Sequence, residues 1–226
     1  MKIFKKPIFV SISPNAQADD VWLALKLMFM PWRWKKGGAI GEFEKKLGEY
    51  LFGETVRDTI SNDCVVTFES GRTALDAILQ ALEIKEGDEV LVQGFTCTAA
   101  VNPILWVGAK PVYVDVERGT YNMSPRELER KITPKSKVVI MQHTFGFPAK
   151  VDEILEITKR HNLIVLEDCA HALGAEYKGQ KVGTFGEASF FSFGRSKVIS
   201  SVFGGAAATR NPELAKKIRE IRGKWE

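Results

Sequence analysis

Two side chains of opposite charge stand in apolar surroundings in the second half of this 226-residue chain. Lys197 follows the run ASFFSFGRS and precedes VISSVFGG, so most of its neighbours along the chain are apolar or small. Asp168 closes the apolar run LIVLED, three residues before His171. Burial lowers the pKa of a lysine and favours its nucleophilic free amine. Such an amine can condense with an aldehyde, and a carboxylate can hold a protonated ring nitrogen.

Two further groups could bind a phosphate. The stretch Ser70-Gly71-Arg72-Thr73 leads from a strand into a helix, and the free N–H groups at a helix start attract anions. Ser192 could converge with Lys197 if the chain between them turns. Each feature alone has a plain structural explanation, since any helix start looks similar and a carboxylate after a strand often caps the next helix. Together the amine, the carboxylate and the phosphate cradle match pyridoxal 5′-phosphate (PLP).

The pattern around these residues predicts an α/β fold. From residue 70 onward, short apolar runs alternate with segments of helical periodicity, as in TALDAILQALEI at 73–84. Strands this apolar are typical of a mainly parallel sheet covered by helices on both faces, a three-layer α/β/α arrangement. Ligands bind beyond the carboxyl ends of such strands. The predicted strands are EVLVQ (89–93), PVYVDV (111–116), KVVIMQH (137–143) and LIVLED (163–168).

The alternation stops in the last third of the chain. Two strand-like runs, near 188–193 and 204–209, flank Lys197 with no helix between them. We expect an antiparallel excursion at the edge of the sheet. A basic helix then starts at Pro212, since proline favours the first helical turn.

Composition excludes several classes of function. The net charge is only +4, from 32 basic and 28 acidic residues, so the sequence gives no support for nucleic-acid binding. Three cysteines without CxxC spacing are typical of free thiols in a reducing cytoplasm, and no metal-ligating set is predicted. Pro7 interrupts the short N-terminal apolar run, so no signal peptide is expected and the cytoplasm is the expected location.

The segment VWLALKLMFMPWRWKKGG, at 21–38, is the most apolar part of the N-terminal region. Its uninterrupted apolar part is shorter than the roughly 20 residues that cross a bilayer. We expect an amphipathic helix packed on the body of the protein or on a partner subunit. Peripheral membrane contact is the alternative, through Trp32, Arg33, Trp34, Lys35 and Lys36.

Several stretches, in order and spacing, resemble the large domain of the DegT/DnrJ/EryC1/StrS family. These are fold-type I PLP-dependent aminotransferases that mostly act on nucleotide-linked keto sugars. The resemblance covers the chain from about residue 14 to its end. It is carried by FESGRTALDAILQAL, GDEVLVQGFTCTAAVNPILWVGAKPVYVDVERGTYN, ITPKSKVVIMQHTFG, LIVLEDCAHALGAEYKGQKVGTFGEASFFSF and the Lys197 region followed by GG.

The resemblance implies roles for residues near the cofactor ring. Lys197 would be the Schiff-base lysine and later the acid/base that moves a proton. Asp168 would pair with the pyridine nitrogen, and His171 would lie beside the ring. His143, in QHTFG, matches a histidine frequent in the family, and both pocket lining and structural hydrogen bonding remain open for it.

The resemblance also implies a phosphate site with two departures nearby. The backbone amides of Gly71 and Arg72, with the Ser192 hydroxyl, would hold the phosphate, although threonine is common in the family where this chain has Arg72. Cys97 stands where the family often places an aromatic residue that stacks on the cofactor ring. A thiol cannot replace that π-surface, so cofactor affinity would fall unless Phe95 compensates.

The expected function follows from the resemblance. The protein would transfer an amino group from a donor such as glutamate to a keto group of a nucleotide-linked sugar, in polysaccharide or secondary-metabolite biosynthesis. Residues 1–50 would form an N-terminal arm and helices, residues 51–226 the PLP-binding large domain, and the protein would be a homodimer. The resemblance also implies a longer protein, with a small C-terminal domain that would follow the point where this chain ends.

Two alternatives remain open. The chain could be a truncated, non-catalytic PLP-binding or dimerisation module. It could also be a PLP-dependent sugar dehydratase, but relatives with that activity replace the lysine with histidine, so Lys197 argues against it.

Overall fold

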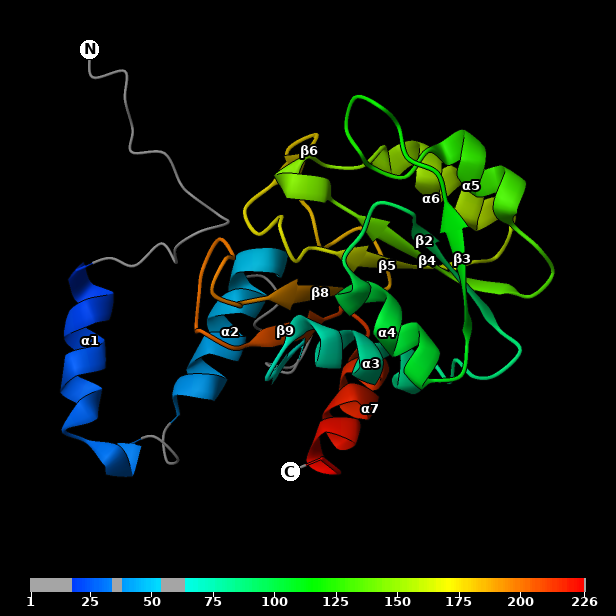
Figure 1. Cartoon of the computed structure of the whole chain (residues 1–226). Coiled ribbons are helices and arrows are strands. Elements are labelled where there is room, and N and C mark those ends of the chain that lie inside the picture. The colour runs from blue at the N-terminus through cyan, green and yellow to red at the C-terminus, as the bar shows by residue number, and fades with distance from the viewer. Residues whose placement is uncertain (1–17, 34–37, 54–63, 226) are drawn as a thin grey trace, which may run out of the picture.

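The computed structural model describes residues 18–33, 38–53 and 64–225. Its centre is a seven-stranded sheet in the order β1-β9-β8-β5-β4-β2-β3, covered by helices (Figure 1). The predicted α/β class is therefore confirmed. Trp34, Lys35 and Lys36 of the proposed membrane contact, and the N-terminal run interrupted by Pro7, lie outside the described residues.

Five of the seven strands run parallel. They are β2 (Glu89–Gln93), β3 (Lys110–Val114), β4 (Ser136–Gln142), β5 (Ile164–Asp168) and β8 (Ala188–Ser192). Each of β2, β4 and β5 is almost wholly buried, which explains why their sequences are continuous apolar runs. Their carboxyl ends meet at one edge of the sheet.

The antiparallel excursion expected around Lys197 is present. Strand β9 (Gly205–Ala208) pairs antiparallel with β8 on one side and with β1 (Val65–Phe68) on the other. It therefore lies one strand in from the edge, and β1 occupies the edge itself. A side chain at Gly205 would put its Cβ 2.2 Å from the Ser70 carbonyl carbon, so only glycine allows β9 to approach the start of the next helix so closely.

Helices cover both faces of the sheet, which completes the three-layer arrangement. One face packs against α3 (Gly71–Ala81), α4 (Thr98–Trp106) and α7 (Pro212–Gly223). The other packs against α5 (Pro125–Lys131) and α6 (Val151–Arg160). The side chains of β2 alternate between the two faces. Val90 and Val92 pack in the apolar cluster under α3, α4 and α7, and Leu91 packs in the cluster under α5 and α6.

Short elements connect this framework. A two-stranded hairpin, β6 (Glu176–Tyr177) and β7 (Gln180–Lys181), follows β5 and was not predicted. Two 3-10 turns are η1 (Pro31–Arg33) and η3 (Thr144–Gly146). Helix α7 begins at Pro212 as predicted, where the Asn211 side chain accepts the N–H groups of Glu213 and Leu214.

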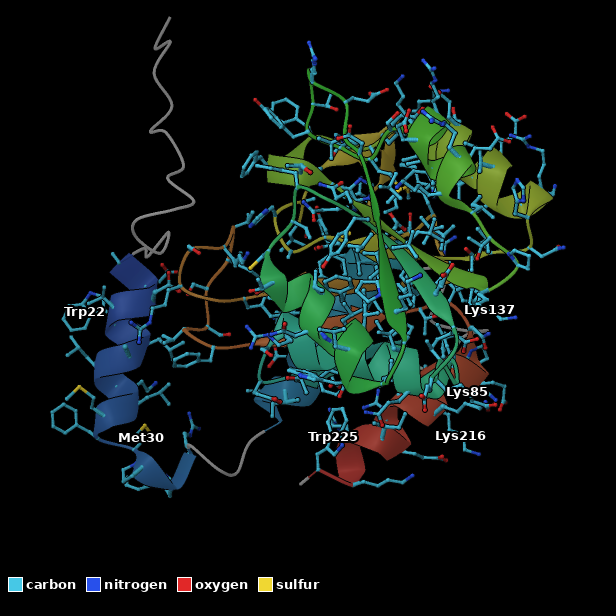
Figure 2. All side chains as sticks on the ribbon, turned by 45° about the vertical axis from the view of Figure 1, so that its right-hand side comes forward. Trp22, Met30, Lys85, Lys137, Lys216 and Trp225 are labelled. Atoms are coloured by element: carbon cyan, nitrogen blue, oxygen red, sulfur yellow. The ribbon has the colours of Figure 1, made fainter. Side chains whose placement is uncertain are left out.

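The N-terminal helices differ in how they pack. Helix α2 (Ala39–Phe52) buries Leu47, Leu51 and Phe52 in a core cluster with β1 and β8, and the boundary proposed after residue 50 falls inside it. Helix α1 (Ala18–Met28) buries none of its residues, and its Trp22 is 72% exposed. Figure 2 shows Trp22 on this helix, apart from the body. Among the described helices, none combines the length and apolar character needed to cross a membrane.

Candidate active site

The start of α3 lies beside the end of β8, as the phosphate-cradle prediction requires. A Cβ placed on Gly71 would lie 2.9 Å from the Phe191 carbonyl oxygen and 3.1 Å from Ser192 Cβ. Ser70 caps the helix by accepting the Thr73 N–H through its hydroxyl at 3.2 Å. The first N–H groups of a helix have no intrahelical acceptor, so those of Gly71 and Arg72 are available to a ligand. The Arg72 side chain is exposed.

Lys197 joins this group through a turn at Gly194. The Lys197 N–H donates to the Gly194 carbonyl at 3.0 Å. A Cβ on Gly194 would lie 3.8 Å from Ser192 Oγ and 3.9 Å from Lys197 Cγ. The turn therefore brings the side chains of Ser192 and Lys197 to the same region, and the meeting of the hydroxyl with the amine stays a prediction.

Lys197 and Asp168 also lie close enough to influence each other's ionisation. Burial lowers the pKa of the Lys197 amine, and the charges of Asp168 and Cys97 act in the opposite direction. Burial raises the pKa of the Asp168 carboxyl, against the Ala170 hydrogen bond and the Lys197 charge. An amine with a lowered pKa is more often free and nucleophilic near neutral pH.

The Asp168 carboxylate is buried and has one oxygen available. Its Oδ1 accepts a hydrogen bond from the Ala170 N–H at 2.9 Å, whereas Oδ2 takes none from the described part of the chain. The Asp168 carbonyl accepts the His143 N–H at 3.1 Å, which ties the ends of β4 and β5 together. A buried carboxylate with a free oxygen suits a ligand that carries its own N–H donor.

His171 lies half-buried in the turn after β5, where an aromatic ring supports it. Its imidazole stacks on Phe145, with centroids 5.8 Å apart and planes at 17°. Burial lowers the pKa of His171, and the Lys197 charge lowers it further. Phe145 adopts a left-handed backbone conformation, with φ of 53°, which is rare for an aromatic residue and typical of functional sites.

Sequence reasoning did not find the aromatic group that Phe145 belongs to. Phe95 lies 5.1 Å from Tyr121 and 6.1 Å from Phe145, measured between ring centroids, so three loops contribute to one row. All three rings are exposed by 45% or more. The sequence shows only that these aromatic residues follow predicted strands. That position does not distinguish them from ordinary aromatic residues in loops. Cys97 precedes α4 and is exposed, near enough to Lys197 for its charge to matter.

These residues fit the cofactor expected from the sequence. The amine of Lys197, the free oxygen of Asp168 and the first turn of α3 offer a partner for an aldehyde, for a ring N–H and for a phosphate. Because Gly71 and Gly205 have no Cβ, strands β8 and β9 can lie close against the backbone at the start of α3.

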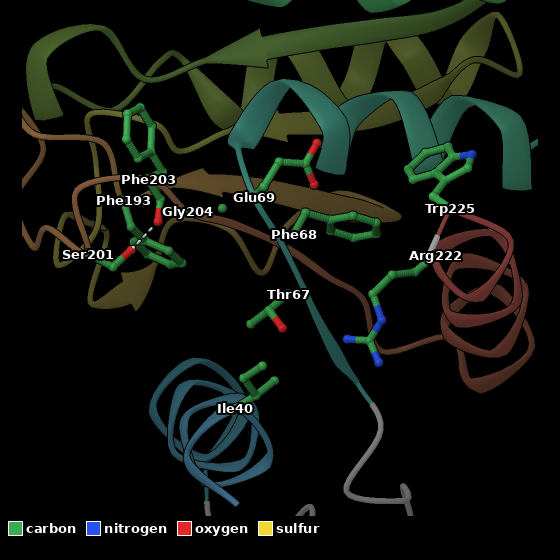
Figure 3. Close-up of a pocket in the computed structure, with 11 residues that line it drawn as sticks. Ile40, Thr67, Phe68, Glu69, Phe193, Ser201, Phe203, Gly204, Arg222 and Trp225 are labelled. Atoms are coloured by element: carbon green, nitrogen blue, oxygen red, sulfur yellow. Dashed lines mark hydrogen bonds between the residues drawn. The ribbon is translucent and has the colours of Figure 1, made fainter. Parts of the chain in front are cut away.

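A pocket of about 440 Å³ lies beside β1 (Figure 3). It is lined by α2, β1, the segment before β9 and the end of α7, through residues such as Ile40, Phe203 and Trp225. It contains neither Lys197 nor Asp168, so the chemistry described above belongs to the strand ends and not to this pocket.

Comparison with known proteins agrees with this geometry. Residues 24–224 match the DegT/DnrJ/EryC1/StrS aminotransferase family. The chain belongs to this family. Its cofactor is pyridoxal phosphate.

Proteins similar to this chain are named for different sugars. GDP-perosamine synthase of Escherichia coli O157:H7 is 40% identical over 92% of this chain and 52% of its own length. UDP-N-acetyl-3-dehydro-alpha-D-glucosamine 3-aminotransferase of Acidithiobacillus ferrooxidans is 44% identical over 70% of this chain and 43% of its own. The PLP form of Spr1654 from Streptococcus pneumoniae has a TM-score of 0.80 at 27% identity, over 99% of this chain and 60% of that one. The chain spans about half the length of these curated relatives.

Proposed function

We propose that this chain is the cofactor-binding part of a sugar aminotransferase. It takes an amino group from an amino acid such as glutamate and delivers it to the keto group of a nucleotide-linked sugar. The observation that carries the proposal is the proximity of a half-buried lysine, Lys197, to a buried carboxylate, Asp168, at the carboxyl ends of the parallel strands, where the charge of each influences the pKa of the other. Relatives named for GDP- and UDP-linked sugars support a nucleotide-linked substrate.

Each residue of the site has a distinct task in this reaction. The bound cofactor supplies an aldehyde that exchanges amines and a ring that accepts electrons. Lys197 Nζ would hold that aldehyde and, when free, would serve as the base for a proton at the substrate carbon bearing nitrogen. Asp168 Oδ2 would accept the hydrogen bond of the ring N–H and favour the proton there. His171, which stacks on Phe145, would lie beside the ring.

The phosphate would be held by backbone groups and one hydroxyl. The N–H groups of Gly71 and Arg72 point from the start of α3, and the positive end of the helix dipole adds to their attraction. Ser192 Oγ would donate from β8. Since these donors are fixed by the fold, they would hold the phosphate without having to rearrange.

We also propose that the protein is a homodimer in the cytoplasm. The apolar residues of α1 support a dimer, because Trp22, Leu23 and Met28 are each more than half exposed and would be covered by a second copy. Sedimentation of the wild-type chain should give a dimer, and Trp22→Glu should shift it toward monomer. A wild-type monomer at micromolar concentration would remove this part of the proposal.

The reaction itself is tested by single-turnover measurements. PLP-loaded chain mixed with glutamate should release one equivalent of 2-oxoglutarate per site and lose the absorbance band of the lysine-bound cofactor. A nucleotide-linked keto sugar should then restore the band and appear as an amino sugar by mass spectrometry. Cofactor binding without any amino-group transfer would favour the non-catalytic module instead.

A further inference from the structure

A buried acid and a buried histidine lie next to Asp168, and the proposed reaction does not use them. His143 and Glu167 are both fully buried, and His143 Nε2 lies 3.0 Å from Glu167 Oε2. His143 follows β4, and Glu167 is the residue before Asp168 on β5. Two titratable side chains in the core need a reason to be there, because isolated buried polar groups destabilise the fold.

The hydrogen bonds determine which ring nitrogen of His143 carries the proton. Nδ1 accepts the Ala149 N–H at 3.1 Å, so Nδ1 has no hydrogen of its own. The hydrogen of the neutral ring is therefore on Nε2, and it is donated to Glu167 Oε2. His143 thus connects the segment after η3 with the end of β5.

Glu167 accepts four hydrogen bonds in all. Its Oε2 accepts the Gly183 N–H at 2.7 Å besides the His143 bond, and its Oε1 accepts the N–H groups of Phe185 at 2.6 Å and Gly186 at 2.8 Å. Cys169 lies nearby, and the ligand atoms of His143, Glu167 and Cys169 are within 4.8 Å of one another. Since both carboxylate oxygens and Nδ1 already accept N–H groups, hydrogen bonding accounts for the cluster without a metal ion.

The turn that supplies three of these donors can exist only with glycine. Gly183 has φ of 92°, and a Cβ there would lie 2.7 Å from the Phe191 ring. The turn therefore sits tightly against β8 and aims its N–H groups at Glu167. The carboxylate is held from the β4 side by His143 and from the β8 side by this turn.

The two acids point to opposite faces of the sheet, because successive side chains in a strand alternate. The neighbour that shares the face of Asp168, Leu166, packs in the cluster of α3 and α7. Val165, which shares the face of Glu167, packs in the cluster of α6. Four hydrogen bonds to Glu167 therefore fix the rotation of β5 about its axis and, with it, the direction of Asp168.

We propose that His143 is a positioning residue, whose Nε2–H bond to Glu167 holds the end of β5 so that Asp168 faces Lys197 and the ring nitrogen of the cofactor. This role rests on the proposed function, since it matters only if Asp168 binds that nitrogen. His143 itself contacts neither Asp168 through its side chain nor the reacting atoms.

Two substitutions separate the two hydrogen bonds of His143. In His143→Gln, the side-chain amide reaches the place of Nε2 and donates to Glu167, but the Ala149 N–H loses its acceptor. In His143→Asn, the shorter amide accepts from Ala149 and cannot reach Glu167. Each variant loses one buried hydrogen bond, and the bond to the charged Glu167 is the stronger of the two. A purely structural role therefore predicts a lower urea midpoint for His143→Asn, but equal PLP affinity and equal titration of bound PLP once both variants are folded.

The positioning role predicts a difference. In the absence of urea, where both variants are folded, His143→Asn should bind PLP about tenfold more weakly than His143→Gln, because only His143→Asn loses the bond that holds Glu167. The absorbance band of bound PLP should titrate at the wild-type pH in His143→Gln and at a displaced pH in His143→Asn. Nitrogen-15 spectra of the apoprotein should show one histidine protonated only on Nε2, and its signal should be absent from both variants.

The outcomes separate the two proposals. If the wild-type chain binds PLP and the two variants bind it equally well with unchanged titration, the positioning role is wrong and the proposed function stands. If the wild-type chain does not bind PLP at all, the proposed function is wrong and the positioning role falls with it. A proton found on Nδ1 of His143 would also overturn the inference.

Discussion

The charge of Asp168 controls how far burial can lower the pKa of Lys197. Burial is the larger effect and lowers that pKa, whereas Asp168 raises it. Asp168→Asn removes the raising effect, so the Lys197 pKa should fall further and the rate at which PLP combines with the amine should reach its midpoint at a lower pH. Stopped-flow absorbance over a pH series measures this. Asp115→Asn, in the turn after β3, is the matched control and should leave the midpoint unchanged.

Asp168→Asn should also weaken cofactor binding. An amide in place of the carboxylate replaces a charge-assisted hydrogen bond to the ring N–H with a neutral one about half as strong, a loss of about 1 to 1.5 kcal/mol, or roughly 5- to 13-fold in the dissociation constant. Unchanged affinity would mean that Asp168 does not face the ring nitrogen.

A substitution at Cys97 tests whether the affinity for PLP can be increased. Cys97→Phe adds an aromatic surface at the position where the family resemblance implies a stacking ring, and a stacked ring is worth about 0.5 to 1.5 kcal/mol. We expect PLP to bind about 2- to 10-fold more tightly, measured by fluorescence titration. Cys97→Ser has no ring and should show no gain. Tighter binding by both variants would show that removal of the thiol, and not stacking, is responsible.

The sequence predicted individual site residues where the proposed chemistry requires one type of side chain. Lys197 and Asp168 stood out because a charge next to an apolar run is unusual, and their convergence at the strand ends followed from the fold class. Phe145 and the His143–Glu167 bond were not predictable, since they depend on a left-handed backbone and on chain segments that meet only in three dimensions. Of the two interpretations left open for His143, the structure supports structural hydrogen bonding.

At the scale of elements, the contact between β9 and the start of α3 sets the shape of the phosphate cradle. Gly205→Ala would place a Cβ 2.3 Å from the Gly71 nitrogen, and backbone cannot give way as a flexible side chain can. We expect a loss of about 3 kcal/mol or more in the free energy of unfolding, measured by urea denaturation.

Gly41→Ala in α2 is the matched control, because nothing lies within 4 Å of its added Cβ. It should stabilise the protein by about 0.5 to 1 kcal/mol, since alanine favours the helix over glycine. A Gly205→Ala variant as stable as wild type would show that β9 and α3 are not in close contact.

The elements were predicted well where periodicity is strong. The buried strands β2, β4 and β5 and the helices α3, α6 and α7 match their sequence patterns closely. The hairpin β6–β7 was missed because strands of two residues have no periodicity to detect. The position of β9 between β8 and β1 was not predictable from local sequence either, since strand order depends on pairing between distant segments.

The chain's two ends are joined by one buried carboxylate. Glu44 of α2 accepts hydrogen bonds from Thr67 of β1 and from Arg219 and Arg222 of α7, residues 175 and 178 positions away. Burial alone would raise the pKa of Glu44, but the hydrogen bonds from Thr67 and Arg219 together lower it. Separations of this length are the reason why no sequence pattern indicated the network.

Glu44→Gln should therefore destabilise the whole molecule by about 3 kcal/mol near neutral pH, because it removes the buried charge that Arg219 and Arg222 both contact. A lowered pKa gives stability that is present above the ordinary glutamate range and is lost as the pH falls through the lowered value. The difference in stability between variant and wild type, measured by thermal unfolding, should therefore become smaller as the pH falls through that range. Glu42→Gln, which breaks only an exposed pair with Lys46 in the same helix, should change stability little at any pH.

The central claim, that Lys197 binds the aldehyde of the cofactor, has one direct measurement. The chain is mixed with PLP, reduced with borohydride, digested and mapped by mass spectrometry. The account predicts one PLP group per chain, attached to the peptide containing Lys197, and none on the Lys197→Ala variant. Labelling spread over other lysines, or equal labelling of wild type and variant, would contradict it.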